Sequence, residues 1–174
     1  MEYGKGFLVL TAVALSISGC MTLHQENSEY KTGNTYLAMM MKMNNATNVV
    51  ARDVKIEIAN ADDGKLTEFS LDQDQPQIAR VEEGRYFIKS AVYEVIVTNG
   101  DGLSSAISDI PMSIVGASDS VFAIVRGELG FVGTFEVRSY GEISYRDELS
   151  EETRNDILKK YGQEARDAIR LVRG

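Results

Sequence analysis

The chain has 174 residues, of which 44% are hydrophobic and 25% charged, and its formal net charge at pH 7 is −8. These values are typical of one soluble globular domain with its own core, and the acidic balance argues against nucleic acid and anionic lipid headgroups as partners. One cysteine and one histidine exclude an internal disulfide and argue against a zinc site of the usual cysteine–histidine type.

Residues 1–19 have the pattern of an export signal. Lys5 lies in a short polar start, residues 7–17 are almost wholly apolar, and two small residues precede Cys20. The apolar run is much shorter than the ~20 residues that a membrane-spanning helix needs. We therefore predict that residues 1–19 are a signal peptide.

The motif Ile17-Ser18-Gly19-Cys20 resembles the lipobox of bacterial lipoproteins. In that family the cysteine is thioether-linked to diacylglycerol, the chain is cut before it, and the new amino group is acylated with a fatty acid such as palmitate. The resemblance implies that Cys20 is the lipid-bearing first residue of the mature protein. Two or three acyl chains hold a protein stably on a bilayer, since each buried methylene contributes ~0.8 kcal/mol.

The residue after the cysteine bears on which membrane holds the lipid. In enteric-type lipoproteins an aspartate at this position favours retention in the inner membrane, and this chain has Met21. The resemblance therefore implies the outer membrane, with the protein facing the periplasm. Residues 21–34 are mostly polar, so we predict that residues 20–34 comprise the lipidated cysteine and a flexible tether.

Strand patterns dominate residues 35–148. Residues 35–43 are apolar and bounded by turn residues. Residues 49–59 contain an alternation of apolar with charged side chains at positions 53–58, which is the period of a half-buried strand. Further strands are predicted at residues 66–71, 77–81, 85–98, 112–115, 120–126 and 131–139. Residues 103–111 are ambiguous.

The number and spacing of these segments predict the fold class. Six to eight short strands with glycine-rich or acidic turns between them predict a mainly β fold, an antiparallel β-sandwich. The turn Gly127-Glu128-Leu129-Gly130 predicts that residues 120–126 and 131–139 form a hairpin.

Residues 149–174 change to a helical period. Ser150 suits an N-cap, two glutamates follow it, and apolar residues then recur at steps of three and four. Gly162 is predicted to end a first helix and begin a second. We predict a C-terminal amphipathic helical segment packed on the sandwich; a helix that binds a partner or lies on the membrane is the alternative.

Residues 81–88 (VEEGRYFI) and 121–135 (VFAIVRGELGFVGTF) combine turn glycines with aromatic residues. The first is similar to a "pGxY" turn and strand, with Glu83 in place of the proline. The second resembles an F-x-V-x-x-G-E-x-x-Y-x-G-x-F hairpin, with Phe131 in place of the tyrosine. Both belong to small exported lipoproteins with a transthyretin-like or carboxypeptidase-regulatory-like β-sandwich, and the resemblance implies a fold without implying an activity.

Candidate catalytic and metal-binding groups each have a structural alternative. His24 lies in the predicted tether, where a fixed triad with a serine and an acid is not expected. Acidic turns at residues 62–64, 72–74 and 99–102 lack the loop spacing of a calcium site, so turn chemistry explains them. Four glutamates are candidates for acid–base work, although exposed faces and turns explain them better. They are Glu82, Glu83, Glu128 and Glu136.

Four methionines lie close together at Met39, Met40, Met41 and Met43. Thioethers favour Cu(I), so copper binding is one hypothesis. A strand would send Met40 to the opposite face from the other three, and methionine commonly fills gaps in cores. Core packing is therefore the preferred interpretation.

We predict from the sequence a membrane-anchored periplasmic lipoprotein that is not an enzyme, needs no cofactor or metal, and acts as a protein-binding or envelope-structural module. Its expected partners are the lipid bilayer, through acylated Cys20, and a protein of the envelope, with no nucleic acid. One alternative is an immunity or inhibitor lipoprotein directed against a basic toxin or hydrolase. The others are a methionine-rich copper-handling lipoprotein and an enzyme with an unrecognised site. Beyond Cys20 the sequence singles out no site residue.

Overall fold

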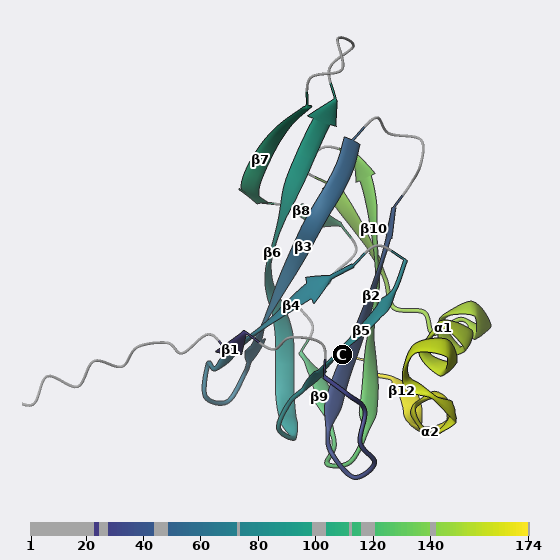
Figure 1. The fold of residues 1–174 in the computed structure, drawn as a ribbon. Helices are drawn as coiled ribbons and strands as arrows, with labels where there is room; N and C mark the ends of the chain where they lie inside the picture. Colours follow the sequence, from purple (N-terminus) through teal and green to yellow (C-terminus); the bar gives the residue numbers. More distant parts are fainter. Residues whose placement is uncertain are drawn as a thin grey trace, which may run out of the picture.

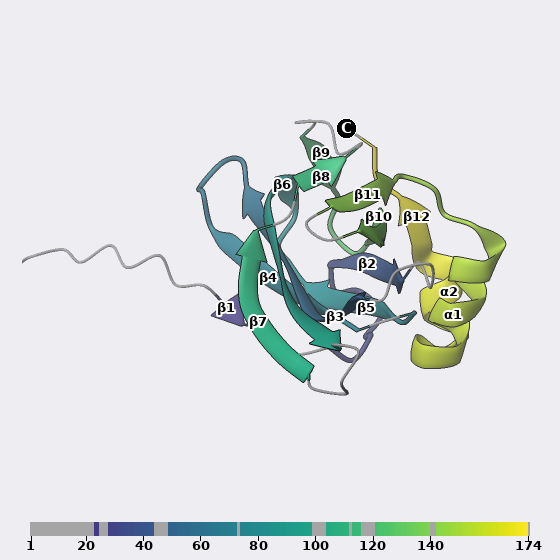
Figure 2. The same ribbon diagram turned by 90° about the horizontal axis from the view of Figure 1, so that it is seen from above.

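Two β-sheets pack face to face, and two short helices lie against the outer side of one of them (Figure 1 and Figure 2). The computed structural model describes residues 23–24, 28–43, 49–72, 74–98, 104–111, 113–115, 121–139 and 142–173. The predicted mainly β sandwich with a C-terminal helical segment is confirmed.

Sheet A has the strand order β1-β4-β3-β6-β7, and β9 pairs with the beginning of β6. Its strands are β1 (Leu23–His24), β3 (Val49–Asn60), β4 (Leu66–Leu71), β6 (Gly84–Thr98), β7 (Ser104–Pro111) and β9 (Phe122–Ile124). The pairing of β1 with β4 is parallel, and the others are antiparallel. The alternation in β3 sends Val54, Ile56 and Ile58 into the core, as its period of two predicts.

Sheet B has the strand order β5-β2-β10-β11-β8, with β12 paired to β10. Its strands are β2 (Tyr36–Met43), β5 (Pro76–Arg80), β8 (Ser113–Val115), β10 (Leu129–Ser139), β11 (Glu142–Arg146) and β12 (Ile169–Leu171). In this sheet β2 runs parallel to β10, whereas β10 and β11 are antiparallel. The parallel pairing places the first long strand of the domain beside one of its last.

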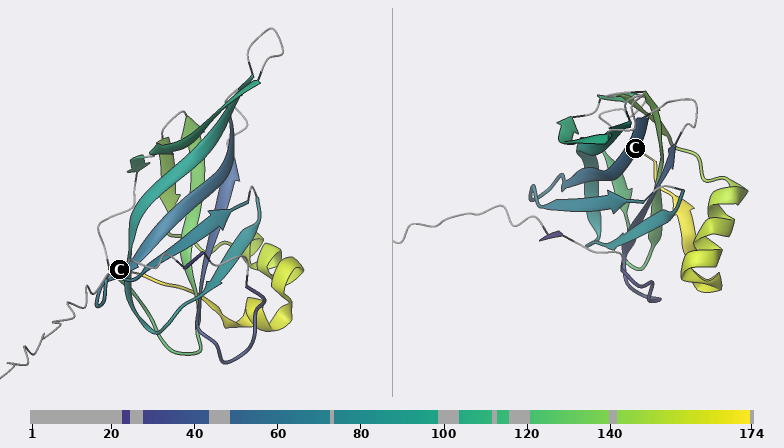
Figure 3. Two further views of the ribbon diagram at one scale, coloured as in Figure 1. Left: turned by 60° about the vertical axis from the view of Figure 1, so that its left-hand side comes forward. Right: turned by 45° about the horizontal axis from the view of Figure 1, so that its top comes forward.

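The helices α1 (Glu151–Tyr161) and α2 (Gln163–Ala168) create a second hydrophobic core. The first core lies between the two sheets and contains Leu37, Met39 and Phe135. The second lies between sheet B and the helices. Its buried members are Tyr36, Ala38, Met40, Ile78, Leu129, Phe131, Ile157, Ala165 and Ile169. Sheet B is therefore buried on both faces where the helices cover it, and Figure 3 shows that they cover one end of it.

The hairpin predicted from residues 127–130 is wrong. Strand β9 pairs with β6 in sheet A and β10 belongs to sheet B, so the chain crosses between the sheets at this turn. The turn is held by the first residue of β2 and the residue before it. Thr35 Oγ1 accepts a hydrogen bond from Gly127 N at 2.9 Å, and Glu128 O accepts one from Tyr36 N at 2.9 Å. A glycine turn between two strands does not by itself decide whether they pair.

The C-terminal segment departs from the predicted helical continuation after Gly162. That glycine, with φ of 88°, does separate two helices as expected, but α2 ends at Ala168. Ile169 then belongs to β12, which adds a parallel strand to the first half of β10. The side chain of Ile169 is fully buried in the second core. It matches the helical period in the sequence, but in the structure it belongs to a strand.

Residues 28–34, assigned from sequence to the tether, lie against the domain. Ser28 N donates to Ile78 O of β5 at 3.3 Å, and Tyr36 Oη donates to Glu29 O at 3.1 Å. The rings of Tyr30 and Tyr36 pack with centroids 5.4 Å apart. The domain therefore begins before the expected boundary at residue 35, and this segment lies along the outer strand β5.

Candidate functional site

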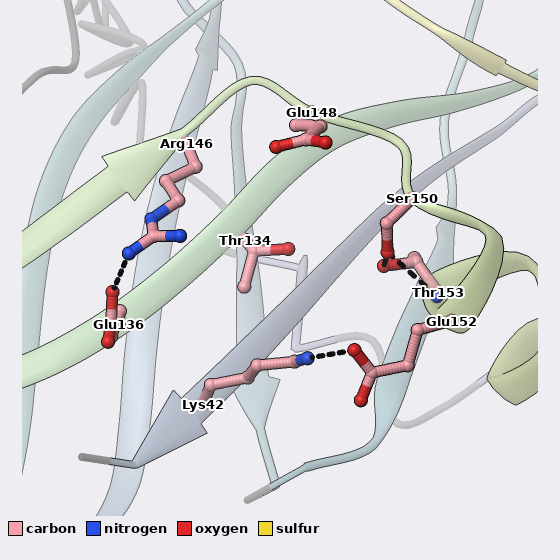
Figure 4. A pocket seen from close by; sticks show the side chains of 8 residues that line it. All are labelled: Lys42, Thr134, Glu136, Arg146, Glu148, Ser150, Glu152 and Thr153. Atoms are coloured by element: carbon pink, nitrogen blue, oxygen red, sulfur yellow. Dashed lines mark hydrogen bonds and ion pairs between the residues drawn. The ribbon is translucent and has the colours of Figure 1, made fainter.

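A polar hollow of about 190 Å³ opens between the outer face of sheet B and the first turn of α1 (Figure 4). It is lined by Lys42, Thr134, Glu136, Arg146, Glu148, Ser150, Glu152 and Thr153. These residues come from β2, β10, β11, the connection to α1, and α1 itself. We call this feature the polar hollow.

The strand period explains why these side chains meet. Lys42 follows Met41, and Glu136 lies between Phe135 and Val137; these neighbours fill the core between the sheets, so Lys42 and Glu136 face outward. The helices cover the half of this face that carries Tyr36 and Met40. The polar hollow begins where that cover ends.

Two ion pairs cross the polar hollow. Lys42 Nζ lies 3.0 Å from Glu152 Oε2, which links β2 to α1. Arg146 Nη2 lies 2.8 Å from Glu136 Oε2, which links β11 to β10. The Ser144 hydroxyl lies 3.5 Å from the same Glu136 oxygen. Both cations of the lining therefore already have a carboxylate partner.

The N-terminus of α1 is also satisfied from within the chain. Ser150 Oγ accepts a hydrogen bond from Thr153 N at 3.1 Å and lies 3.0 Å from Thr153 Oγ1. Glu151 and Glu152 in the first turn place negative charge at the positive end of the helix. This helix end is therefore capped and offers little attraction to an added anion.

Two groups of the lining have no partner in the part of the chain that the structure describes. Thr134 is only 9% exposed, and its hydroxyl makes no hydrogen bond to a described residue. The carboxylate of Glu148 forms no ion pair or hydrogen bond within the same ranges, and Figure 4 shows it at the rim of the polar hollow. The Thr134 oxygen is not among the buried unpartnered atoms of the described residues, so it is open to solvent in the polar hollow.

The four candidate glutamates do not converge. Glu82 pairs with Lys65 at 3.4 Å, and Glu83 pairs with Arg126 at 2.8 Å. Glu128 Oε2 accepts a hydrogen bond from Val125 N at 3.1 Å within its own turn. Of these four, only Glu136 lines the polar hollow. Turn and ion-pair roles account for the other three.

The acidic turn at residues 62–64 is explained by local hydrogen bonds, and residue 73 of the turn at 72–74 lies outside the described residues. Asn60 Oδ1 accepts a hydrogen bond from Asp62 N at 2.8 Å, and Asp63 Oδ1 accepts one from Lys65 N at 2.9 Å. The hydrogen bond from Arg85 lowers the pKa of the Asp62 carboxyl. Among the described ranges no group of three or more histidine, cysteine, aspartate or glutamate residues is arranged to hold a metal ion. The turn at residues 99–102 lies outside the described residues.

The methionines divide between the two cores, as the strand period predicts. Met39 and Met41 are buried between the sheets, and Met40 is buried beneath the helices. The side chain of Met43 lies outside the described residues. The three described thioethers are therefore packing groups on opposite faces of β2, and they do not form a shared surface site.

A second hollow, of about 350 Å³, lies between the loop before β5 and α1. Lys160 Nζ donates to Gln75 Oε1 at 3.3 Å and to Gln77 Oε1 at 3.2 Å. Burial lowers the pKa of Lys160. Lys159 pairs with Asp156 at 3.0 Å. Both lysines that line this hollow therefore serve contacts within the chain.

Four residues of the polar hollow were not predictable as candidates from the sequence: Lys42, Thr134, Arg146 and Glu148. Lys42 and Thr134 are more than ninety positions apart, and only the parallel pairing of β2 with β10 makes them neighbours. Arg146 ends β11, a strand that the sequence patterns did not predict. The apolar residues beside these positions predict the strands, but they do not indicate which polar side chains lie close together in the fold.

Comparison with protein-family models, with curated proteins and with solved structures finds no match to this chain. The two family resemblances therefore stay predictions. The predicted signal peptide, residues 1–19, and Cys20 lie outside the described residues. Over the ranges that the structure does describe, no helix is long and apolar enough to cross a membrane.

Proposed function

We propose that this chain is a bacterial lipoprotein, anchored through acylated Cys20 to the envelope membrane and facing the periplasm, whose β-sandwich binds another protein. The observation that carries the proposal is the motif at residues 17–20, which follows an apolar run of the right length and contains the only cysteine of the chain. The outer membrane is the proposed location because Met21 follows the cysteine.

The protein-binding role is supported by charge and by anchoring. The net charge of −8 favours a basic partner through long-range attraction. An anchor confines the domain to one surface and raises its effective concentration there, so an interface of modest affinity suffices. We propose no catalytic role, because the candidate glutamates are accounted for by turns and ion pairs.

Intact-mass analysis of the chain extracted from membranes tests the anchor. The expected mass is that of residues 20–174 with added acyl groups, and the Cys20→Ala variant should lack both the cleavage and the acyl groups. An unmodified or uncleaved chain would contradict the anchor. Crosslinking in intact envelopes, followed by identification of the captured protein, then tests the binding role.

An inhibitor or immunity lipoprotein that neutralises a basic toxin or hydrolase is the second candidate. The acidic net charge favours it over a purely structural role. It predicts one tight complex with a cationic protein, weakened strongly by salt because screening shortens the range of the attraction. Several weak partners with little salt dependence would instead favour the envelope-structural role. Copper handling is not carried forward, because the described methionines are buried on opposite faces of β2.

A further inference from the structure

We infer that one end of sheet A rests on a zwitterionic phospholipid surface, with the lipid anchor at one edge of the sheet and the exposed valines Val121 and Val125 at the other. The inference rests on the proposed acylation of Cys20 and deepens it, because it names the surface of the domain that faces the bilayer. It is carried by the pairing of β1 with β4 and by the position of the exposed valines beside β9.

Strand β1 determines where the anchor leaves the domain. Leu23 lies opposite Thr67 at the beginning of β4. Because the pairing is parallel, the N-terminal end of β1 points toward the turn between β3 and β4, at residues 61–65. Cys20 is three residues before Leu23, a stretch that spans at most about 11 Å. An acylated Cys20 therefore holds this edge of sheet A close to the bilayer.

The same end of sheet A carries β9 at its other edge. Strand β9 pairs with residues 84–86 at the start of β6, whereas β7 pairs with residues 92–98 further along that strand. At this end the strand order is therefore β1-β4-β3-β6-β9, and four strand spacings of ~4.8 Å place β1 and β9 about 19 Å apart. Figure 1 shows β9 and the turn after it at the lower end of the molecule. We call this end of sheet A, with its turns at residues 61–65, 81–83 and 125–128, the turn end.

The two valines are the exposed large hydrophobic residues of the part of the chain that the structure describes. Val125 is 60% exposed and Val121 is 42% exposed, whereas Phe122 and Ile124 between them are buried, as the strand period requires. Isolated apolar residues are common on protein surfaces. These two lie along one edge strand, at the end of the sheet toward which β1 directs the anchor. A bilayer held at the turn end by Cys20 therefore covers them.

The charges of the turn end decide the kind of lipid. Cations here pair with carboxylates: Lys65 with Glu82, Arg85 with Asp62, and Arg126 with Glu83. Asp63 and Glu128 lie in the same turns and add negative charge. The turn end is therefore acidic, and an anionic lipid surface would repel it. A zwitterionic surface permits the apolar contact without this cost.

The acyl chains and the valines have different roles. Two or three acyl chains already hold a protein stably on a bilayer, so the valines are not needed for attachment. Contacts at two edges of the sheet instead fix its tilt relative to the membrane. Helix α1 packs on the outer side of sheet B, and we expect it to stay away from the lipid.

The test uses the full lipidated chain in nanodiscs of phosphatidylcholine that contain a small fraction of lipid with a nitroxide on its headgroup. Paramagnetic broadening of each backbone amide reports its distance from the headgroups. The amides to compare belong to three exposed residues: Asp63 in the turn before β4, Gly127 in the turn after β9, and Asn155 in α1.

Two double variants and one insertion separate the contributions. Val121→Thr with Val125→Thr keeps the branched shape and replaces a methyl group by a hydroxyl. Val121→Ile with Val125→Ile is the matched control that keeps the apolar contact, and both pairs of changes are at exposed positions, so the fold should be preserved. An insert of about ten glycine and serine residues after Thr22 lengthens the anchor as a flexible coil.

In the wild-type chain we expect strong broadening of the Asp63 and Gly127 amides and little broadening of the Asn155 amide. The threonine variant should lower the population with Gly127 at the surface about fivefold, the effect of losing part of the burial of two valines, while Asp63 stays broadened. The isoleucine variant should match the wild type. The insertion should reduce the broadening of both amides, and anionic phosphatidylglycerol should reduce that of Gly127.

Three results would overturn the inference: equal broadening of all three amides, Gly127 broadening that is the same in the threonine variant and the wild type, or no effect of the insertion. Intact mass of the same sample separates this failure from that of the proposed function. An acylated chain without the expected pattern retains the anchor and loses the orientation, whereas an unacylated chain overturns the proposed anchor and the orientation with it.

Discussion

Gly133 in β10 lies so close to β11 that only a glycine fits. A Cβ built there would lie 2.4 Å from Tyr145 Cε2 and 2.7 Å from the backbone oxygen of Arg146. The Tyr145 ring is held in place, because its hydroxyl donates to Val132 O at 2.6 Å and its ring packs on Phe135 with centroids 5.4 Å apart. Relief of the clash would require β10 and β11 to move apart.

We therefore expect Gly133→Ala to lower the free energy of unfolding by about 1–3 kcal/mol, the usual cost of overpacking. Gly130→Ala in the same strand is the matched comparison, since its Cβ would meet only side-chain ends, Ile124 Cδ1 at 2.4 Å and Val172 Cγ1 at 2.6 Å. Chemical unfolding should rank Gly133→Ala as the more destabilising change. The opposite ranking would show that β10 and β11 separate easily.

Two tyrosines are expected to lower the stability of the fold at high pH. Burial raises the pKa of Tyr145 to about 12 and that of Tyr161 to about 12. The Tyr161 hydroxyl donates to Pro76 O at 3.1 Å, which holds α1 on β5. Both phenols release their protons near pH 10 in an unfolded chain. The stability that depends on them is complete below pH 10 and is lost as the pH rises through about 12.

The expected outcome is a free energy of unfolding that falls between pH 10 and pH 12. In Tyr161→Phe this fall should be smaller, because one of the two phenols is gone. Ultraviolet absorbance at high pH should show these tyrosines titrating later than exposed ones. A pH profile of stability identical in the wild-type chain and Tyr161→Phe would contradict the prediction.

Strand β2 is the element on which both cores depend. From Tyr36 to Met41 its odd and even positions are equally buried, because sheet A covers one face and the helices cover the other. The period-two rule gives the direction of each side chain, but the depth of burial on the second face depends on α1 and α2. A strand with water on one face would tolerate changes at every second position.

Met39→Ala and Met40→Ala should therefore each lower the free energy of unfolding by about 2–5 kcal/mol, the range for methionine removal from a core. Lys42→Ala is the control from the same strand, and should change stability by less than about 1 kcal/mol because its ion pair is partly exposed. Urea unfolding at fixed pH measures all three. A Met40→Ala variant as stable as the wild type would mean that the helices do not bury this face.

Helix α1 depends on Ser150, whose hydroxyl accepts the hydrogen bond from Thr153 N. Ser150→Ala should lower the free energy of unfolding by about 1 kcal/mol, whereas Ser150→Asp should preserve it, since aspartate is an equally good N-cap. The two variants share a position, so the comparison isolates the cap from other local effects. Equal stability of the alanine and aspartate variants would contradict a capping role.

Elements of this protein were predictable where the signal is local. The bounds of β4 and the start of α1 follow from alternation and from the Ser150 cap, both of which act within a few residues. Pairings between distant segments were not predictable, because nothing in the sequence indicates the register of β2 against β10. The helical period also predicts a helix where β12 lies, because Ile169 satisfies either period. The first residues of β10, which β11 does not reach, pair with β12 and decide between the two.

The polar hollow is the least predictable feature, because it needs the pairing of β2 with β10, the unpredicted strand β11, and the end of helical cover at the same place. A lysine, a threonine and an arginine on separate strands have no shared motif. The motif at residues 17–20, which resembles a lipobox, is the opposite case, since it lies within four consecutive residues and its prediction needs no knowledge of the fold.

In the whole molecule, the C-terminal segment covers an apolar part of the outer face of sheet B. Where the helices cover it, the face of sheet B that points away from sheet A is apolar, and its buried residues include Tyr36, Leu129 and Phe131. Ile157, Ala165 and Ile169 supply the facing surface. The segment is therefore part of the core of the domain.

Truncation after Glu148 should accordingly leave a sandwich with an exposed apolar face. We expect a lower melting temperature, binding of the dye ANS and self-association, because an apolar surface of this kind is rarely left bare in a monomer. Truncation after Val172 is the control, since it removes exposed Arg173 while keeping β12. Melting curves, ANS fluorescence and light scattering distinguish the two. A chain that ends at Glu148 yet stays monomeric, binds no dye and melts like the full chain would mean that sheet B needs no cover, and that the helices are free to leave it and bind elsewhere.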